Sequence, residues 1–155
     1  MTNHNENDTK TSKRRLWLGV LARAATSELE QAALTLGAVP PLEHVRPAEI
    51  GMVMLRGRIG GTGDAFNLGE ASVTRCALRA GASALGVGYT LGRDRRKAEL
   101  IALMDALLQD TERNQKIMHE VVEPMAGRQL AQRTEAGRMA ATSKVEFFTF
   151  VRGQT

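Results

Sequence analysis

The residues best suited to chemistry are an arginine and the glycine-rich loop that follows it. Arg58 stands just before Gly60, Gly61, Thr62 and Gly63. Consecutive backbone N–H groups in such a loop can surround an anion, and a guanidinium can bind a phosphate through two parallel hydrogen bonds. The loop lacks the Lys and the Ser or Thr that complete a P-loop. Spacing alone therefore favours an ordinary hairpin turn, in which glycine is the usual residue, over a phosphate site.

A second anion-binding candidate is Arg93 with Asp94, which precede Arg95 and Arg96. These residues stand where an apolar helical pattern begins, and backbone N–H groups at a helix N-terminus can bind anions. Asp94 also suits the simpler role of a helix N-cap, with the arginines exposed to solvent. The general preference for Asp at N-caps favours this simpler interpretation.

No set of residues forms a self-sufficient catalytic or metal site. The three histidines do not have the spacing of metal ligands, and the single cysteine, Cys76, provides no zinc site. Residue order also suggests no Ser-His-Asp or Cys-His pair. We therefore expect this chain to bind no metal and no cofactor, and its catalytic residues, if any, are unknown. This pattern describes a subunit better than an independent enzyme.

The positive charge of the chain is concentrated in its middle. The formal net charge is +4, while residues 56–97 contain eight basic and three acidic side chains. Such a segment attracts anions, for example a phosphate ester, a triphosphate or a nucleic acid. A solvated basic sheet surface explains the same pattern equally well.

The C-terminal end is rich in aromatic residues. Phe147, Phe148 and Phe150 lie within the last ten residues, together with Val151 and Arg152. A chain end frays unless something ties it down. An aromatic end therefore packs either against its own sheet or against a partner, two alternatives that we weigh equally. We take these five residues as a candidate partner interface.

Short strands between helical segments predict an α+β fold with a small antiparallel sheet. We expect about four strands. They include an edge strand at residues 42–46 that ends before Pro47, the strands of a hairpin around the glycine loop, and strands at residues 71–79 and 84–92. In the last strand Gly86 and Gly88 share one face. A helix, a partner chain or a ligand can approach the backbone closely there.

Apolar residues at helical spacing predict helices before and after these strands. We expect an N-terminal helical segment that starts near Lys13 and ends near Gly37, and two C-terminal helices. The first of these two is long and runs past Arg113 until Pro124 stops it, and the second spans residues 126–142. Residues 1–12 should be disordered, which leaves residues 13–155 as a single domain.

The composition excludes several classes of protein. With 43% hydrophobic and 25% charged residues, the chain has the composition of a globular domain. No apolar run is long enough to cross a bilayer, and the first residues lack the apolar core of a secretory signal. A single cysteine excludes an internal disulfide and suits a reducing compartment. We therefore expect a cytoplasmic protein with no membrane partner.

Three ordered blocks resemble the PhnG family, whose members are subunits of the bacterial carbon–phosphorus lyase system for phosphonate use. The first block is Arg58-x-Gly60-Gly61-Thr62-Gly63-x-x-Phe66-x-x-Gly69, followed by Thr74-Arg75. The second is Leu91-Gly92-Arg93-Asp94, and the third is Phe147-Phe148-x-x-Val151-Arg152-Gly153. The similarity runs from about Leu16 to Gly153, and so covers nearly the whole chain.

The resemblance implies a role within a hetero-oligomeric complex. Members of this family act with PhnI, PhnH and PhnL to transfer the ribose triphosphate of ATP to a phosphonate, with release of adenine. They also form a two-fold symmetric core complex with PhnH, PhnI and PhnJ. The implied partners are PhnI-, PhnH- and PhnJ-like subunits, with PhnL- or PhnK-like ATP-binding proteins in addition, and ATP is a substrate of the complex. PhnI is then the expected home of the chemistry, and this chain a structural or site-completing partner.

Two other classes of function are the alternatives. A stand-alone RNA-binding module would use the basic sheet, but single-strand binders stack bases on aromatic side chains. Among the sheet residues only Phe66 and Tyr89 qualify. A small independent phosphotransferase needs a set of metal-binding carboxylates, and the basic segment has few acids. We therefore expect neither nucleic-acid binding nor independent turnover.

Overall fold

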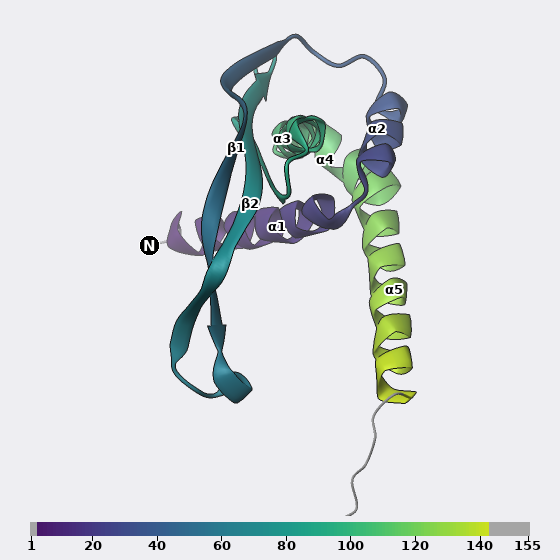
Figure 1. Cartoon of the computed structure of the whole chain (residues 1–155). Coiled ribbons are helices and arrows are strands. Elements are labelled where there is room, and N and C mark those ends of the chain that lie inside the picture. Colours follow the sequence, from purple (N-terminus) through teal and green to yellow (C-terminus); the bar gives the residue numbers. More distant parts are fainter. Residues whose placement is uncertain (1–2, 143–155) are drawn as a thin grey trace, which may run out of the picture.

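The fold is a three-stranded antiparallel sheet with helices packed on one side (Figure 1). The structure is a computed structural model and describes residues 3–142. The strands are β1 (Leu42–Arg58), β2 (Ala65–Ala80) and β3 (Gly86–Leu91), in the order β1-β2-β3. The predicted α+β class is confirmed, with three strands rather than about four. Residues 42–46 and the first hairpin strand form β1 together, and the second hairpin strand joins residues 71–79 in β2.

β1 continues through Pro47, where we expected a strand to end. The strand lies at the edge of the sheet, and a proline at an edge need not interrupt a ladder of hydrogen bonds. The chain adapts through bulges, because the register with β2 shifts between His44 and Arg46 and again between Arg46 and Glu49. The expected short edge strand is therefore the first part of one long strand.

Five α-helices accompany the sheet within residues 3–142: α1 (Asn3–Arg23), α2 (Thr26–Thr35), α3 (Arg95–Leu108), α4 (Thr111–Ile117) and α5 (Glu123–Thr142). Two shorter segments are a 3-10 turn, η1 (Ile59–Gly61), and a π-helix, η2 (Met118–Val122). α1 is already helical at Asn3, the first described residue, so residues 3–12, for which we expected disorder, are helical. Extending a helix that is already docked costs much less than nucleating a new one. None of the described helices combines the length and the hydrophobicity needed to cross a bilayer.

The chain also remains helical through Pro124, which we expected to stop it. α3 does end earlier, at Leu108, but η2 leads directly into α5. In η2 the Glu123 N–H bonds to the Met118 carbonyl, five residues back, which is the wider register of a π-helix. Because proline has no N–H to contribute, this wider turn just before Pro124 allows α5 to follow. The last helix, α5, continues at least to Thr142, the last described residue, so its predicted end at residue 142 stays a prediction.

α3 is the centre of the core and lies directly on the glycine face of β3. A Cβ atom on Gly88 would stand 1.9 Å from the carbonyl oxygen of Ala98, and one on Gly86 would stand 2.0 Å from that of Ala102. No side chain fits at these distances. The expected close approach to β3 is therefore confirmed, and the approaching element is a helix of the same chain.

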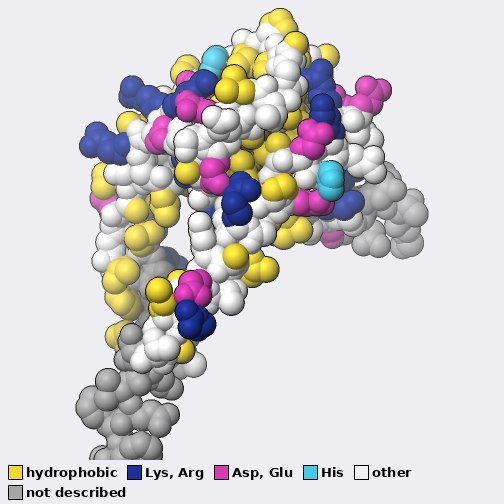
Figure 2. Space-filling view, turned by 90° about the vertical axis from the view of Figure 1, so that its right-hand side faces the viewer, with side chains coloured by type: hydrophobic (Ala, Val, Ile, Leu, Met, Phe, Trp, Pro, Cys, Tyr) yellow, Lys and Arg dark blue, Asp and Glu magenta, His cyan; other side chains and the backbone are white. Residues whose placement is uncertain are grey.

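Two parts of the chain project from this body on the same side (Figure 1). One is the outer part of the β1–β2 hairpin, residues 51–72, which we call the arm. β3 pairs with β2 only from Val73 to Leu78 and does not extend into the arm. The other projection is α5, in which residues 130–142 are exposed. Figure 2 shows hydrophobic side chains along the projecting part of the molecule on the left.

Candidate functional site

The glycine loop is the tip of the arm and folds as a tight turn. Gly60 has φ +61°, a left-handed conformation that favours glycine. The Gly63 N–H donates to the Ile59 carbonyl at 3.0 Å, and a Cβ on Gly63 would stand 2.8 Å from that oxygen. Arg58 Nη1 donates to the Gly63 carbonyl at 3.0 Å and so closes the turn. Local structure alone therefore accounts for these residues.

Arg58 keeps further donors that an anion can use. A guanidinium has five N–H donors, the hydrogen bond to Gly63 uses one of them, and the side chain is exposed. Thr62 is also exposed at the tip. The turn geometry is thus compatible with an anion at the tip, and anion binding by Arg58 and residues 60–63 stays a prediction.

Asp94 is the N-cap of α3, as predicted. Its Oδ1 accepts a hydrogen bond from the Lys97 N–H at 2.9 Å, and its Oδ2 accepts one from the Thr26 hydroxyl at 2.5 Å. The hydrogen bond from Thr26 is the main reason that the pKa of Asp94 is lowered. The carboxylate itself therefore brings negative charge to the N-terminus of α3, and Arg93 lies exposed beside it. This arrangement agrees with the capping interpretation; anion binding here stays a prediction.

The structure does not bring the two candidate anion sites together. Leu91, just before Arg93, pairs with Val73, whereas Arg58 pairs with Ala65 at the far end of the arm. The eight steps along β2 from Val73 to Ala65 span about 26 Å at roughly 3.3 Å per residue. The two candidates therefore belong to separate surfaces.

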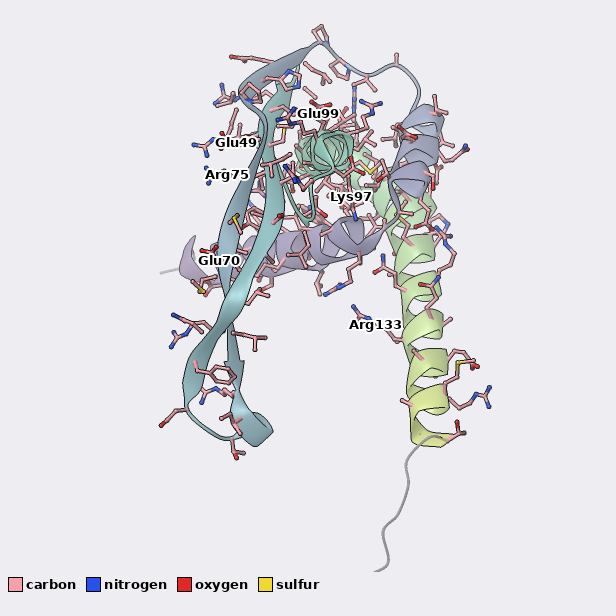
Figure 3. All side chains as sticks on the ribbon, in the orientation of Figure 1. Glu49, Glu70, Arg75, Lys97, Glu99 and Arg133 are labelled. Atoms are coloured by element: carbon pink, nitrogen blue, oxygen red, sulfur yellow. The ribbon has the colours of Figure 1, made fainter. Side chains whose placement is uncertain are left out.

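Arginines of the basic segment are partly neutralised within the chain. Glu49 accepts hydrogen bonds from Arg75 at 2.6 Å and from Arg46 at 3.0 Å. Figure 3 shows Glu49 and Arg75 together on the side of the sheet opposite α3. The hydrogen bond from Arg75 lowers the pKa of Glu49. These exposed ion pairs add little stability, but they reduce the positive charge that this face offers to an anion.

The most extensively bonded carboxylate is Asp105, which we did not single out from the sequence. It is fully buried, at 0% exposure. It accepts two hydrogen bonds from Arg14, at 2.6 and 3.1 Å, one from Trp17 Nε1 at 2.9 Å and one from the Val87 N–H at 2.8 Å. Asp105 thus connects α1, α3 and β3. The available signal was a carboxylate inside an apolar helical stripe, since a buried charge needs partners.

The same cluster covers the first part of the outer edge of β3. The Val87 N–H, which donates to Asp105, belongs to that edge strand. The nearby Leu85 carbonyl accepts hydrogen bonds from Arg14 at 3.1 Å and from Gln109 at 3.0 Å. Edge strands with free backbone groups are ready to pair with other chains. Side chains of Arg14, Asp105 and Gln109 therefore occupy the first part of this edge, at Leu85 and Val87.

The described residues contain no catalytic or metal-binding cluster that we recognise. No group of His, Cys, Asp and Glu side chains among them is arranged to hold a metal ion. His119 lies 3.2 Å from a carboxylate oxygen of the exposed Glu123. Cys76 is buried, and burial raises the pKa of its thiol to about 11. At neutral pH this thiol is protonated and unsuited to nucleophilic attack.

A groove of about 770 Å³ lies between α2, β1 and α3. Leu78 and Leu100 contribute to its apolar floor. At its rim Arg96 is paired with Glu30 at 3.6 Å and with Glu99 at 3.9 Å. A small-molecule site usually has a few polar groups that converge on the ligand. Here the charged groups pair with one another, so we assign no ligand to the groove.

The candidate partner interface at the C-terminal end lies after Thr142 in the sequence. Its residues, Phe147, Phe148, Phe150, Val151 and Arg152, lie outside the described part of the chain. Their role at an interface stays a prediction.

Comparison with known proteins identifies relatives of the chain. The family model for the phosphonate metabolism protein PhnG matches residues 12–153. The chain is 40% identical, over 149 residues, to the alpha-D-ribose 1-methylphosphonate 5-triphosphate synthase subunit PhnG of Rhizobium meliloti (strain 1021). That similarity covers 95% of this chain and 94% of the relative. The range matched by the family model contains the glycine loop, Arg93 with Asp94, and the aromatic end.

Proposed function

The chain belongs to the PhnG family of phosphonate metabolism proteins, and on this basis we propose that it is a subunit of a complex that makes alpha-D-ribose 1-methylphosphonate 5-triphosphate. The observation that carries this proposal is the 40% identity to the Rhizobium subunit over nearly the full length of both chains. The lack of a recognisable catalytic cluster in residues 3–142 supports a subunit that works with others.

In the proposed reaction, the complex transfers the ribose 5-triphosphate group of ATP to a phosphonate. The bond between C1′ of the ribose and N9 of adenine breaks, a bond from C1′ to a phosphonate oxygen forms, and adenine leaves with a proton. Both substrates are anions, so such a site needs fixed donors and positive charge. We assign the chemistry itself to a PhnI-like subunit, with PhnH- and PhnL-like proteins also required and a PhnJ-like subunit in the core complex.

The tip of the arm is our proposed contribution of this chain to that site. Arg58 and the loop of residues 60–63 would line an anion-binding edge that another subunit completes. The proposal is supported by an exposed guanidinium at the end of a projecting hairpin, next to glycine backbone that a ligand can approach closely. Arg is also the side chain best suited to bidentate phosphate contact.

The two projections are our proposed contact surfaces for partner subunits. On α5 the side chains of Leu130 and Met139 are 66% and 61% exposed. In Figure 3, Arg133 extends from α5 toward the side on which the arm lies. An exposed helix with apolar side chains beside an exposed hairpin is typical of a surface that another chain covers. The aromatic end, which follows α5, would extend this surface.

The rival RNA-binding function has less support. Phe66 lies in the arm, where it pairs with Gly57, whereas Tyr89 lies on β3 opposite Arg75. The two aromatic side chains therefore do not lie on neighbouring positions for stacking successive bases. Arg75 is also paired with Glu49, as described above.

Co-expression with a PhnI-like subunit tests the proposed assembly. We expect the two chains to co-elute in size-exclusion chromatography, and deletion of residues 145–155 to weaken or abolish co-elution, because the aromatic end would then be missing from the interface. Deletion of residues 2–8, at the other end of the chain, is the matched control and should leave co-elution unchanged. Co-elution of the C-terminally truncated chain at unchanged affinity would contradict this part of the proposal.

A further inference from the structure

One stretch of the outer edge of β1 is suited to pairing with a further strand. Seven consecutive residues, Glu49–Leu55, pair with β2 in a regular register, and the register shifts just before and just after them. Prolines and bulges discourage edge strands from pairing, and this stretch contains neither. At the other side of the sheet, the side chains around Asp105 occupy the first part of the β3 edge. We call residues 49–55 of β1 the free edge.

The direction of the backbone groups on the free edge follows from the pairing of β2. The Ser72 carbonyl accepts a hydrogen bond from the Gly92 N–H at 2.8 Å, on the β3 side of β2. In an antiparallel ladder the N–H and C=O of one residue point to the same side, so those of Ser72 point away from β1. Met52 lies opposite Ser72 and therefore directs its own N–H and C=O outward from the sheet. By alternation, Ile50 and Met54 do the same.

The side chains of the free edge are apolar on both faces of the arm. Met52 and Met54, on one face, are 63% and 51% exposed, and Leu55, on the other face beside Val53, is 39% exposed. A two-stranded ribbon is only marginally stable in water unless it gains a third strand or a packed face. Within residues 3–142 the arm has no third strand, because β3 ends its pairing with β2 at Val73. An added strand would therefore bury apolar surface on both of its faces.

The two ends of the free edge are positively charged. Arg56 and Arg58 follow it toward the tip and are exposed. At the other end, Arg46 and Arg75 share the single carboxylate of Glu49, at 3.0 and 2.6 Å. A complementary strand is thus apolar in its middle and acidic near its ends, since opposite charges in cross-strand positions stabilise a sheet.

We propose that the free edge receives an extended segment of another subunit of the proposed complex, which pairs with β1 as an additional strand. The segment has about seven residues, matching the free edge, with apolar side chains on both faces and acidic side chains near its ends. This inference rests on the proposed function, because it takes the partner from that complex. A second copy of this chain fits less well. Antiparallel pairing of two copies over these residues would bring Arg58 of each copy toward Arg46 of the other, and like charges opposite each other destabilise a sheet.

Two substitutions at Met52 separate backbone pairing from side-chain contact. Met52→Pro removes an outward N–H and places its ring where the added strand would lie. Met52 makes no ladder bond to β2, so the arm itself should tolerate this change. Met52→Ala, the matched control, shortens the side chain and keeps the N–H. We expect Met52→Pro to bind the partner subunits at least ten-fold more weakly than Met52→Ala, with equal urea unfolding midpoints for the two isolated chains.

Hydrogen exchange of the unsubstituted chain tests the same inference without any change in folding. The chain is compared alone and in the complex with PhnI-, PhnH- and PhnJ-like subunits, and exchange is read at single residues. Amides of Ile50, Met52 and Met54 should exchange about a hundred-fold more slowly in the complex, because they gain acceptors there. Amides of Gly51 and Val53 point toward β2 and should change less. Amides of the buried part of α3 should not change.

Several results would overturn the inference. A complex that forms and releases adenine while these three amides exchange as in the chain alone would refute strand addition and leave the proposed function standing. Equal partner binding by Met52→Pro and Met52→Ala would also refute it. Protection already present in the isolated chain would make this chain itself the occupant, or a second copy if protection rises with concentration together with a dimer in size-exclusion chromatography. A chain that joins no complex would contradict both the inference and the proposed function.

Discussion

Replacing Asp105 with asparagine is expected to lower the free energy of unfolding by about 2–4 kcal/mol. The amide keeps only one acceptor oxygen and places an NH₂ group among donors from Arg14, Trp17 and Val87. A buried donor without an acceptor is costly. The lower end of this range is smaller than the loss for breaking a fully buried ion pair, because the Arg14 side chain is 32% exposed. Few single substitutions in this chain should destabilise it more.

Urea unfolding followed by tryptophan fluorescence measures this effect. Trp17 is the only tryptophan, and its Nε1 donates to Asp105, so the probe reports on the cluster itself. Asp110→Asn is the matched control. Asp110 is the N-cap of α4, and asparagine serves as well at that position, so a change below about 0.5 kcal/mol is expected. Equal unfolding midpoints for Asp105→Asn and the original chain would show that the cluster does not hold α1 in place.

Sequence patterns predicted the parts of the fold that depend on local spacing. The alternation of Gly86 and Gly88 in β3 indicated a close neighbour, and Asp94 indicated the start of α3. Local patterns could not predict the features that allow a proline to remain within a strand or a helix. Pro47 remains within β1 because the strand happens to lie at the sheet edge, and Pro124 remains within a helix because η2 widens the preceding turn. The partners of Asp105 come from distant parts of the chain, which periodicity does not reveal.

Replacing Arg58 with alanine is expected to reduce adenine release by the assembled complex while leaving assembly intact. Loss of one charged hydrogen bond costs about 1.5–3 kcal/mol, which corresponds to roughly a ten- to hundred-fold lower rate if the contact forms in the transition state. Arg58→Lys should restore activity only in part, because an ammonium cannot make the bidentate contact of a guanidinium. Adenine formed from ATP and methylphosphonate is the quantity to measure.

Arg56→Ala is the matched control for this substitution. Arg56 lies on the same strand of the arm, two residues before Arg58, and is also exposed. An equal loss in both variants would indicate a general effect of positive charge rather than a specific contact. Full activity of Arg58→Ala would leave Arg58 as the residue that closes the turn through Gly63. Loss of assembly would place it in a subunit interface instead.

The candidate site could be predicted only in pieces. The glycines and Arg58 were recognised as a turn or an anion site from their types alone, and the structure places them at the tip of the arm. That Arg93 lies far from this tip depends on where β3 pairs along β2. No local pattern specifies that offset. The sequence therefore indicated two candidates without their separation, and the structure places them on separate surfaces.

The most direct test of the central claim is an omission experiment. PhnI-, PhnH- and PhnL-like subunits are combined with ATP and methylphosphonate, with and without this chain, and released adenine is quantified. We expect rapid release with the complete set and release near background when this chain is omitted, and we expect the purified chain to restore release when it is added. Equal adenine release with and without the chain would contradict its role as a subunit needed for ribose 1-methylphosphonate 5-triphosphate synthesis.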